Sequence, residues 1–195
     1  MKRHHARFSC ALFFFKSAPG SNRHLGSHRA GGVTVITHGF NSNVTDWIIP
    51  MAEAMPLHAN FPGTSFSCYV ISITRNGSGQ YIATASLVGG VNPTQSDSGE
   101  IFVKLDWSTL SSVGGPSTTT IATAAVSALL STTLIPEMNG RPLAELPLHL
   151  VGHSRGGSVI TEIARLMGAQ GIWVDQVTTL DPRPVPQFGD AAVTT

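Results

Sequence analysis

The residues best suited to chemistry in this sequence lie in the segment Gly152-His153-Ser154-Arg155-Gly156. A serine flanked by glycines at this spacing is typical of a nucleophile elbow, a turn that exposes the serine oxygen for attack on a carbonyl carbon. The pattern alone is weak, because the chain contains 20 glycines. Its surroundings strengthen it, since residues 146–151 predict an apolar strand before it and residues 154–169 predict an amphipathic helix after it.

The glycines around Ser154 are those that such a turn requires. A direct passage from strand to helix forces the serine into strained backbone angles, and Gly152, Gly156 and Gly157 leave the space that it needs. The serine then lies at the N-terminus of a helix, where backbone amides favour developing negative charge. We therefore predict that Ser154 is a nucleophile. The alternative is a glycine-rich corner with an incidental serine.

A second glycine-containing turn follows the β-branched run Val33–Thr37, which predicts a buried strand. Two backbone amides, one from this turn and one from the residue after the nucleophile, can bind the oxyanion that forms during attack. We assign these amides to Phe40 and Arg155, and Gly39 allows the backbone to turn. The alternative is an ordinary turn at a strand end. His38 is expected to bond the loop rather than to accept a proton from the serine.

The acid of a catalytic triad is predicted at Asp181. It directly follows the apolar segment 174–180, which predicts a strand, and Pro182 fixes the turn after it. One strand–helix–strand unit separates it from Ser154, so both residues can share one edge of a parallel sheet. A carboxylate there would orient a histidine and stabilise its protonated form. An Asp-Pro turn that only caps the strand is the alternative. Weaker candidates for the acid are Asp106, Asp175 and Asp190.

The general base that a serine nucleophile needs is harder to place. In this architecture the histidine follows the acid in the chain, yet residues 182–195 contain no histidine. His153 adjoins Ser154, but neighbours in a tight turn point apart, and His149 is expected to be a core residue within its strand. We therefore expect the catalytic histidine beyond Thr195, and a fold that is incomplete at its C-terminus.

Strands and helices alternate along the rest of the chain. Nearly all-apolar strands that alternate with helices predict an α/β fold with a mostly parallel sheet and helices on both faces. An Asn-Gly pair at 76–77 indicates a turn that could join two strands into a hairpin. The further elements expected are helix 44–55, strand 67–74, its hairpin partner 81–85, loop 89–99, strand 101–107 and helix 118–134.

Composition limits the classes of function. Apolar residues make up 42% of the chain and charged residues 12%, which is typical of a globular protein. Residues 1–29 carry six basic side chains and no acid, and the rest carries six basic and eleven acidic ones. The body is thus mildly acidic and has no basic face for nucleic acid. We predict a poorly ordered basic arm over 1–31 and one partial α/β domain over 32–195.

The sequence leaves the compartment and the oligomeric state open. The apolar run 10–15 behind a basic start suits either a secretion signal or a disordered start. No stretch reaches the ~20 apolar residues of a membrane span. Cys10 and Cys68 form no disulfide framework, and no metal-ligand spacing is present, so neither metal nor cofactor is expected.

With these motifs in place, residues 33–186 resemble the lipase and esterase branch of the α/β-hydrolases, and the pancreatic-lipase-like family in particular. The matching segments are Val-Ile-Thr-His-Gly-Phe at 35–40 with Trp47, Leu-Asp-Trp-Ser at 105–108, Leu-Val-Gly-His-Ser-Arg-Gly-Gly at 150–157 and Thr-Leu-Asp-Pro at 179–182. The resemblance implies hydrolysis of a small-molecule or lipid carboxylic ester through an acyl-enzyme on Ser154, with Asp181 as the triad acid.

Three features depart from that family. Its disulfides and its histidine are absent, and Arg155 stands where lipases often carry leucine. The length and composition of residues 86–100 make that segment a candidate lid. Two alternatives to a serine ester hydrolase stay open: a non-catalytic binding module with the same fold, which the missing histidine favours, and an acyltransferase that uses the same serine.

Overall fold

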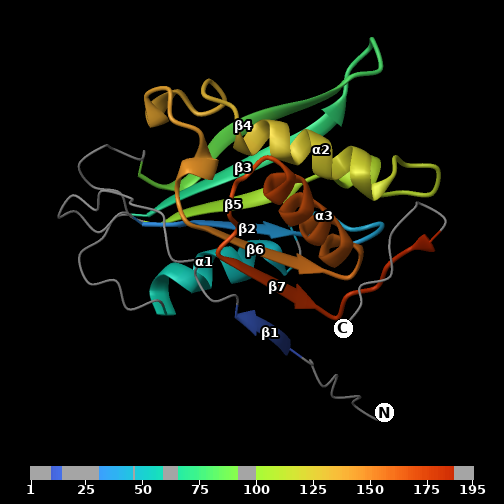
Figure 1. The fold of residues 1–195 in the computed structure, drawn as a ribbon, viewed down its shortest axis with the longest axis horizontal. Helices are drawn as coiled ribbons and strands as arrows, with labels where there is room; N and C mark the ends of the chain where they lie inside the picture. The colour runs from blue at the N-terminus through green and yellow to red at the C-terminus, as the bar shows by residue number, and fades with distance from the viewer. Residues whose placement is uncertain (1–9, 15–30, 46, 59–65, 92–99, 187–195) are drawn as a thin grey trace.

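A computed structural model describes residues 10–14, 31–45, 47–58, 66–91 and 100–186. A single twisted sheet runs through it, with α1 on one face and α2 and α3 on the other (Figure 1). The strands are β1 (Cys10–Phe14), β2 (Val33–Thr37), β3 (Ser67–Arg75), β4 (Tyr81–Gly90), β5 (Ile101–Asp106), β6 (Leu148–His153) and β7 (Gln176–Leu180). The α-helices are α1 (Ile48–His58), α2 (Thr118–Leu129) and α3 (Arg155–Ala169).

The sheet contains seven strands in the order β1-β7-β6-β2-β5-β3-β4. Its five inner strands are parallel to one another, and β1 and β4 pair antiparallel at the two edges. All five residues of the central strand β2 are buried, as expected for a parallel strand covered on both faces. The predicted fold class, an α/β protein with a mostly parallel sheet and helices on both faces, is confirmed.

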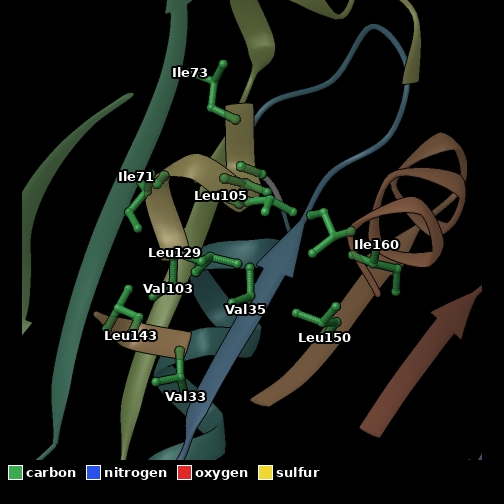
Figure 2. Close-up of a cluster of buried hydrophobic side chains, with 14 of the residues drawn as sticks. Val33, Val35, Ile71, Ile73, Val103, Leu105, Leu129, Leu143, Leu150 and Ile160 are labelled. Carbon is green, nitrogen blue, oxygen red and sulfur yellow. The ribbon is translucent and has the colours of Figure 1, made fainter. Parts of the chain in front are cut away.

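Two apolar clusters hold the helices against the sheet. The larger lies on the face covered by α2 and α3, where strand residues such as Val35 and Leu150 meet Leu129 and Ile160 (Figure 2). The smaller lies on the opposite face and consists of Ile36, Val44, Ile48, Ala52 and Val151. Successive strand residues point to opposite faces, so Val35 and Ile36 serve different clusters. Each such buried side chain contributes about 1.5–3 kcal/mol to folding.

Two predicted helices differ from the observed ones at their ends. Helix α1 begins at Ile48 rather than 44, because the Asn43 side chain accepts a hydrogen bond from the Thr45 amide and forms a local turn instead. Helix α2 begins as expected behind Ser117, whose side chain caps it, but ends at Leu129 rather than 134. Beyond that point the Ser131 hydroxyl accepts from the Thr133 and Leu134 amides and so competes with the helical hydrogen bonds.

Part of the N-terminal segment expected to be a poorly ordered arm, Cys10–Phe14, forms a strand. Strand β1 lies within it and pairs along β7, from Cys10 opposite Leu180 to Phe14 opposite Gln176. The physical reason is that the outer edge of β7 offers unpaired backbone groups, which an apolar run can satisfy as a strand. Residues 1–9 and 15–30 lie outside the described part of the chain.

Both ends of the candidate lid lie at the amino ends of the parallel strands, on the opposite edge of the sheet from Ser154. Residues 86–90 belong to strand β4, which runs antiparallel to β3 and places Gly90 opposite Ser67, at the start of β3. Glu100 lies just before β5 and bonds the Gly32 amide at 2.7 Å, also at the amino ends of the parallel strands. Ser154 follows the carboxyl end of β6. The lid prediction is therefore wrong for the described residues; 92–99 lie outside them.

Candidate active site

Ser154 occupies a strained turn between β6 and α3. Strand β6 ends at His153, helix α3 begins at Arg155, and Ser154 between them has φ 54° and ψ −126°. These backbone angles lie outside the regions that residues other than glycine normally adopt, and holding them costs about 1–3 kcal/mol. Two backbone hydrogen bonds hold the turn: the Ser154 amide donates to Leu180, and the Ser154 carbonyl accepts from Gly157, both at 3.0 Å.

The three glycines of the elbow lie against neighbouring atoms that leave little or no room for a side chain. A Cβ on Gly152 would lie 2.3 Å from the Gly156 carbonyl oxygen, and one on Gly156 would lie 2.4 Å from the His38 carbonyl oxygen. A Cβ on Gly157 would lie 3.0 Å from Pro182 Cβ. The start of α3 thus packs directly on the ends of β2 and β7, and this close approach requires glycine.

The loop after β2 lies beside the serine. A Cβ on Gly39 would lie 2.8 Å from Ser154 Cβ and 3.2 Å from Ser154 Oγ. Phe40 follows Gly39 directly, and Arg155 follows Ser154 as the first residue of α3. The structure therefore brings together the two segments to which the oxyanion amides are assigned, although they lie far apart in the sequence.

His38 is a fully buried member of this loop. Its Nδ1 lies 2.8 Å from the Gly39 carbonyl oxygen, and its Nε2 lies 3.1 Å from the Trp107 amide nitrogen. The Trp107 amide can only donate, so Nε2 accepts and Nδ1 carries the proton that it donates to Gly39. With both ring nitrogens engaged, His38 bonds the loop and has no free nitrogen to act as a base.

Asp106 ends β5 next to this ring. Its Oδ1 accepts a hydrogen bond from the Ser108 amide at 2.9 Å and lies 3.4 Å from His38 Nε2. Burial raises the pKa of Asp106, but the nearby His38 ring and the hydrogen bond from Ser108 outweigh burial and hold this pKa below its ordinary value of 3.8. Because Nε2 already accepts from Trp107, the Ser108 amide is the donor that stabilises the carboxylate when His38 is neutral.

Asp181 follows β7 at the same edge of the sheet as Ser154. The register of β6 and β7 pairs His153 with Leu180, so Ser154 and Asp181 follow neighbouring positions on adjacent strands. Asp181 also has a positive φ, 42°. Its side chain is exposed, and its Oδ2 lies 3.3 Å from Arg183 Nε. The carboxylate is placed near the elbow, but its partner here is an arginine.

The described histidines do not form the missing base. Burial lowers the pKa of His153; the charge of Asp181 opposes this effect and that of Arg183 adds to it. The His153 ring packs edge-on against Trp47, with centroids 5.3 Å apart. His149 is half-buried rather than a fully buried core residue, and its Nε2 lies 2.9 Å from Thr178 Oγ1. Among the described side chains, no histidine bonds to Ser154 or Asp181. Outside them lie His4, His5, His24, His28 and His58.

The other candidate acids are placed away from the serine or outside the described residues. Asp175 Oδ2 accepts from the Leu148 amide at 2.8 Å, at the beginning of β6 rather than its end. Asp190 lies outside the described part. Of the predicted carboxylates, Asp181 is therefore the one that follows the strand adjacent to the elbow.

Trp107 is a member of the site to which sequence reasoning assigned no role beyond its place in the segment Leu-Asp-Trp-Ser at 105–108. It is fully buried, and its indole Nε1 donates to Thr37 Oγ1 at 2.8 Å. Its ring stacks on the His38 ring with centroids 4.4 Å apart, and the Arg155 guanidinium carbon lies 5.5 Å from its centre. The sequence offered one indication of this role: Trp107 lies at the end of a predicted buried strand, at the edge of the sheet where the site lies.

The described residues contain neither a cluster of metal ligands nor a membrane-spanning helix. No three His, Cys, Asp or Glu side chains among them lie close enough together to hold a metal ion. In the same ranges, no helix combines the length and the apolar character needed to cross a bilayer.

Comparison with known proteins gives similarity to solved structures alone. No family model and no curated protein matches the chain. A proposed cell surface hydrolase from Lactobacillus plantarum WCFS1 is similar over 78% of this chain, with 12% identity and a TM-score of 0.43. The product of the gene lin2722 from Listeria innocua is similar over 74%, with 16% identity and a TM-score of 0.42. The chain spans about half the length of each, 53% and 48%.

Proposed function

We propose that the protein is a serine hydrolase of the α/β-hydrolase type that cleaves carboxylic esters through an acyl-enzyme on Ser154. One observation carries the proposal: Ser154 holds φ 54° and ψ −126° at the junction of β6 and α3. A residue other than glycine keeps such a backbone conformation only where the surrounding structure enforces it. Residues strained in this way cluster at active sites. Gly39 beside the serine and Asp181 just after the next strand also support the proposal, because they place the oxyanion loop and a candidate triad acid near Ser154.

The proposed reaction proceeds in two halves. Ser154 Oγ attacks the ester carbonyl carbon, and a general base takes the hydroxyl proton. The resulting oxyanion is bound by the backbone amides of Phe40 and Arg155. The tetrahedral intermediate collapses, the carbon–oxygen bond to the alcohol breaks, and the alcohol leaves with the proton. Water then attacks the acyl-enzyme with the same base, releases the carboxylic acid and restores Ser154.

In this proposal the general base is a histidine from outside the described part of the chain. Asp181 would accept its ring proton and so fix the tautomer that can receive the serine proton. The Asp181 side chain is exposed and directly follows β7, the strand next to β6, so a histidine could approach it. Arg183, its present partner, holds an exposed ion pair, and such pairs are weak enough to be exchanged.

A second candidate function is a non-catalytic binding module. It is favoured by the Asp181–Arg183 ion pair, together with the lack of a histidine bonded to Ser154 or Asp181 among the described side chains. Such a module would use the same sheet edge to bind a ligand without cleaving it.

Active-site labelling distinguishes these functions. The full-length protein is treated with a fluorophosphonate probe, and the labelled peptide is identified by mass spectrometry, with Ser154→Ala as the matched variant. A serine hydrolase carries the label on Ser154, and the variant carries none. A folded protein whose Ser154 stays unlabelled contradicts the proposal. Release of p-nitrophenol from p-nitrophenyl esters of different chain lengths then tests ester cleavage, and an added alcohol acceptor reveals any acyl transfer.

A further inference from the structure

Trp107 contacts both segments that supply the proposed oxyanion amides. Toward the loop after β2, its amide and ring engage His38, and its indole nitrogen donates to Thr37. Toward the elbow, its ring lies under the Arg155 guanidinium. His38, Trp107 and Arg155 are each 0% exposed. We call these three residues the Trp107 cluster.

On the loop side, the cluster fixes the orientation of the peptide group between Gly39 and Phe40. His38 Nδ1 donates to the Gly39 carbonyl at 2.8 Å. That carbonyl and the Phe40 N–H belong to the same planar trans peptide, so they point in opposite directions and turn together. The His38 ring cannot rotate freely, because Trp107 bonds its other nitrogen and stacks on its face. The direction of the Phe40 N–H is thus tied to the position of Trp107.

On the elbow side, the cluster anchors the residue after the nucleophile. Arg155 directs its guanidinium into the protein, where Nη2 donates to the Pro116 carbonyl at 2.9 Å and lies 3.4 Å from Thr118 Oγ1. These groups form the start of α2, which packs against α3. Because both the planar guanidinium and the backbone of Arg155 are held, the Arg155 N–H has little freedom to shift. A leucine at this position would lack these bonds.

We propose that Trp107 and Arg155 are positioning residues that fix the separation and direction of the Phe40 and Arg155 amides. The inference rests on the proposed function, because it concerns the oxyanion site of that reaction. The cluster acts through His38 and through the guanidinium, and neither the Trp107 ring nor the Arg155 side chain touches substrate. Loss of the cluster should therefore slow the chemical step and leave ester binding nearly unchanged.

The test uses the full-length protein with Trp107→Leu, Trp107→Phe, Arg155→Met and Arg155→Lys. Trp173→Leu is the control for the first pair, since Trp173 is 46% exposed, and Arg165→Met is the control for the second, since Arg165 is exposed. Two readouts are needed. Amide hydrogen exchange at Phe40 and Arg155 is independent of any reaction, and steady-state ester hydrolysis separates kcat from KM.

Trp107→Leu and Arg155→Met are expected to lower kcat about 10- to 100-fold with KM within about twofold of the parent, since small displacements of catalytic groups have effects of this size. Exchange at Phe40 and Arg155 should become faster, while the amides of Val35 and Leu150 in the core strands keep their protection. For Trp107→Phe and Arg155→Lys, both kcat and the exchange rates should lie between those of these variants and those of the parent protein, because each substitution retains part of the contact. Both control variants should match the parent.

Unchanged exchange at Phe40 and Arg155 in folded Trp107→Leu overturns the inference, and so does faster exchange with an unchanged kcat. If Ser154→Ala hydrolyses esters as well as the parent, the proposed function fails instead. In that case the exchange readout alone decides whether the cluster holds the two amides, so the two failures remain distinct.

Discussion

The Ser154 amide donates to the Leu180 carbonyl at 3.0 Å, and this bond joins the ends of two neighbouring parallel strands. The residue after Leu180 is Asp181, and both Ser154 and Asp181 hold positive φ angles, 54° and 42°. Two strained side-chain-bearing residues thus lie at adjacent strand ends, on either side of one hydrogen bond. Strain of this kind persists only where surrounding contacts enforce it, and here the glycine packing of α3 provides them.

Strain at Ser154 can be measured without any substrate. Ser154→Ala keeps the strained backbone, whereas Ser154→Gly relieves it. Glycine also costs about 0.5–1 kcal/mol of chain entropy, against strain of about 1–3 kcal/mol. We expect Ser154→Gly to be more stable than Ser154→Ala by about 1 kcal/mol in urea denaturation. The same pair at Ser127, an exposed position within α2, should show the opposite order, because glycine disfavours a helix. If Ser154→Ala were the more stable variant, as expected at Ser127, this order would contradict strain at position 154.

Close contact between Gly39 and Ser154 predicts a second effect. A Cβ at position 39 would lie 2.8 Å from Ser154 Cβ, so Gly39→Ala must displace either the loop or the serine. We expect a loss of about 1–3 kcal/mol in unfolding free energy and loss of fluorophosphonate labelling. Gly168→Ala is the matched control. That glycine lies in α3 with open space around it, so alanine should stabilise the helix by about 0.5–1 kcal/mol. Full labelling of Gly39→Ala would show that the loop does not abut the serine.

Features set by neighbours in sequence were predictable. The strand 33–37 was predicted with its observed bounds, because β-branched residues favour strands and the glycines before them mark its beginning. The hairpin of β3 and β4 was predicted from the Asn-Gly pair at 76–77. The observed turn spans residues 76–80, and its glycine with a positive φ is Gly79 rather than Gly77. The glycines around Ser154 indicated a tight elbow, and the observed backbone has one.

Features set by distant parts of the chain were not predictable. Strand β5 lies between β2 and β3, and no local pattern reports that order. Pairing of Cys10–Phe14 with β7 depends on a free sheet edge far along the chain. Arginine side chains are mostly exposed in folded proteins. Arg155 is nevertheless fully buried, because its guanidinium lies over the Trp107 ring and donates to the Pro116 carbonyl.

The environment of Asp106 predicts an effect of acid on stability. Its pKa in the folded protein lies below 3.8, its ordinary value in the unfolded chain. Burial raises this pKa, but the nearby His38 ring and the hydrogen bond from Ser108 lower it by more. The carboxylate therefore adds stability above pH 3.8, and this contribution is lost as the pH falls through the folded-state pKa. Asp106→Asn should unfold about 1 kcal/mol more easily at pH 7, and the difference should shrink below pH 3.8. A difference that persists unchanged at pH 3 would contradict this. Glu145→Gln, in an exposed ion pair, is the control.

His149 predicts a second pH dependence, at higher pH. Burial lowers its pKa below the ordinary 6.5, so the folded protein keeps the ring neutral while the unfolded chain takes up a proton below pH 6.5. Stability should consequently fall as the pH decreases from 6.5 and level off below the folded-state pKa. His149→Gln can keep a hydrogen bond to Thr178 and has no charge to gain, so its unfolding free energy should fall less between pH 7 and pH 5. His153→Gln separates the contribution of the second histidine, whose pKa is also lowered by burial. Parallel curves for the parent and His149→Gln would show that the buried ring does not govern this dependence.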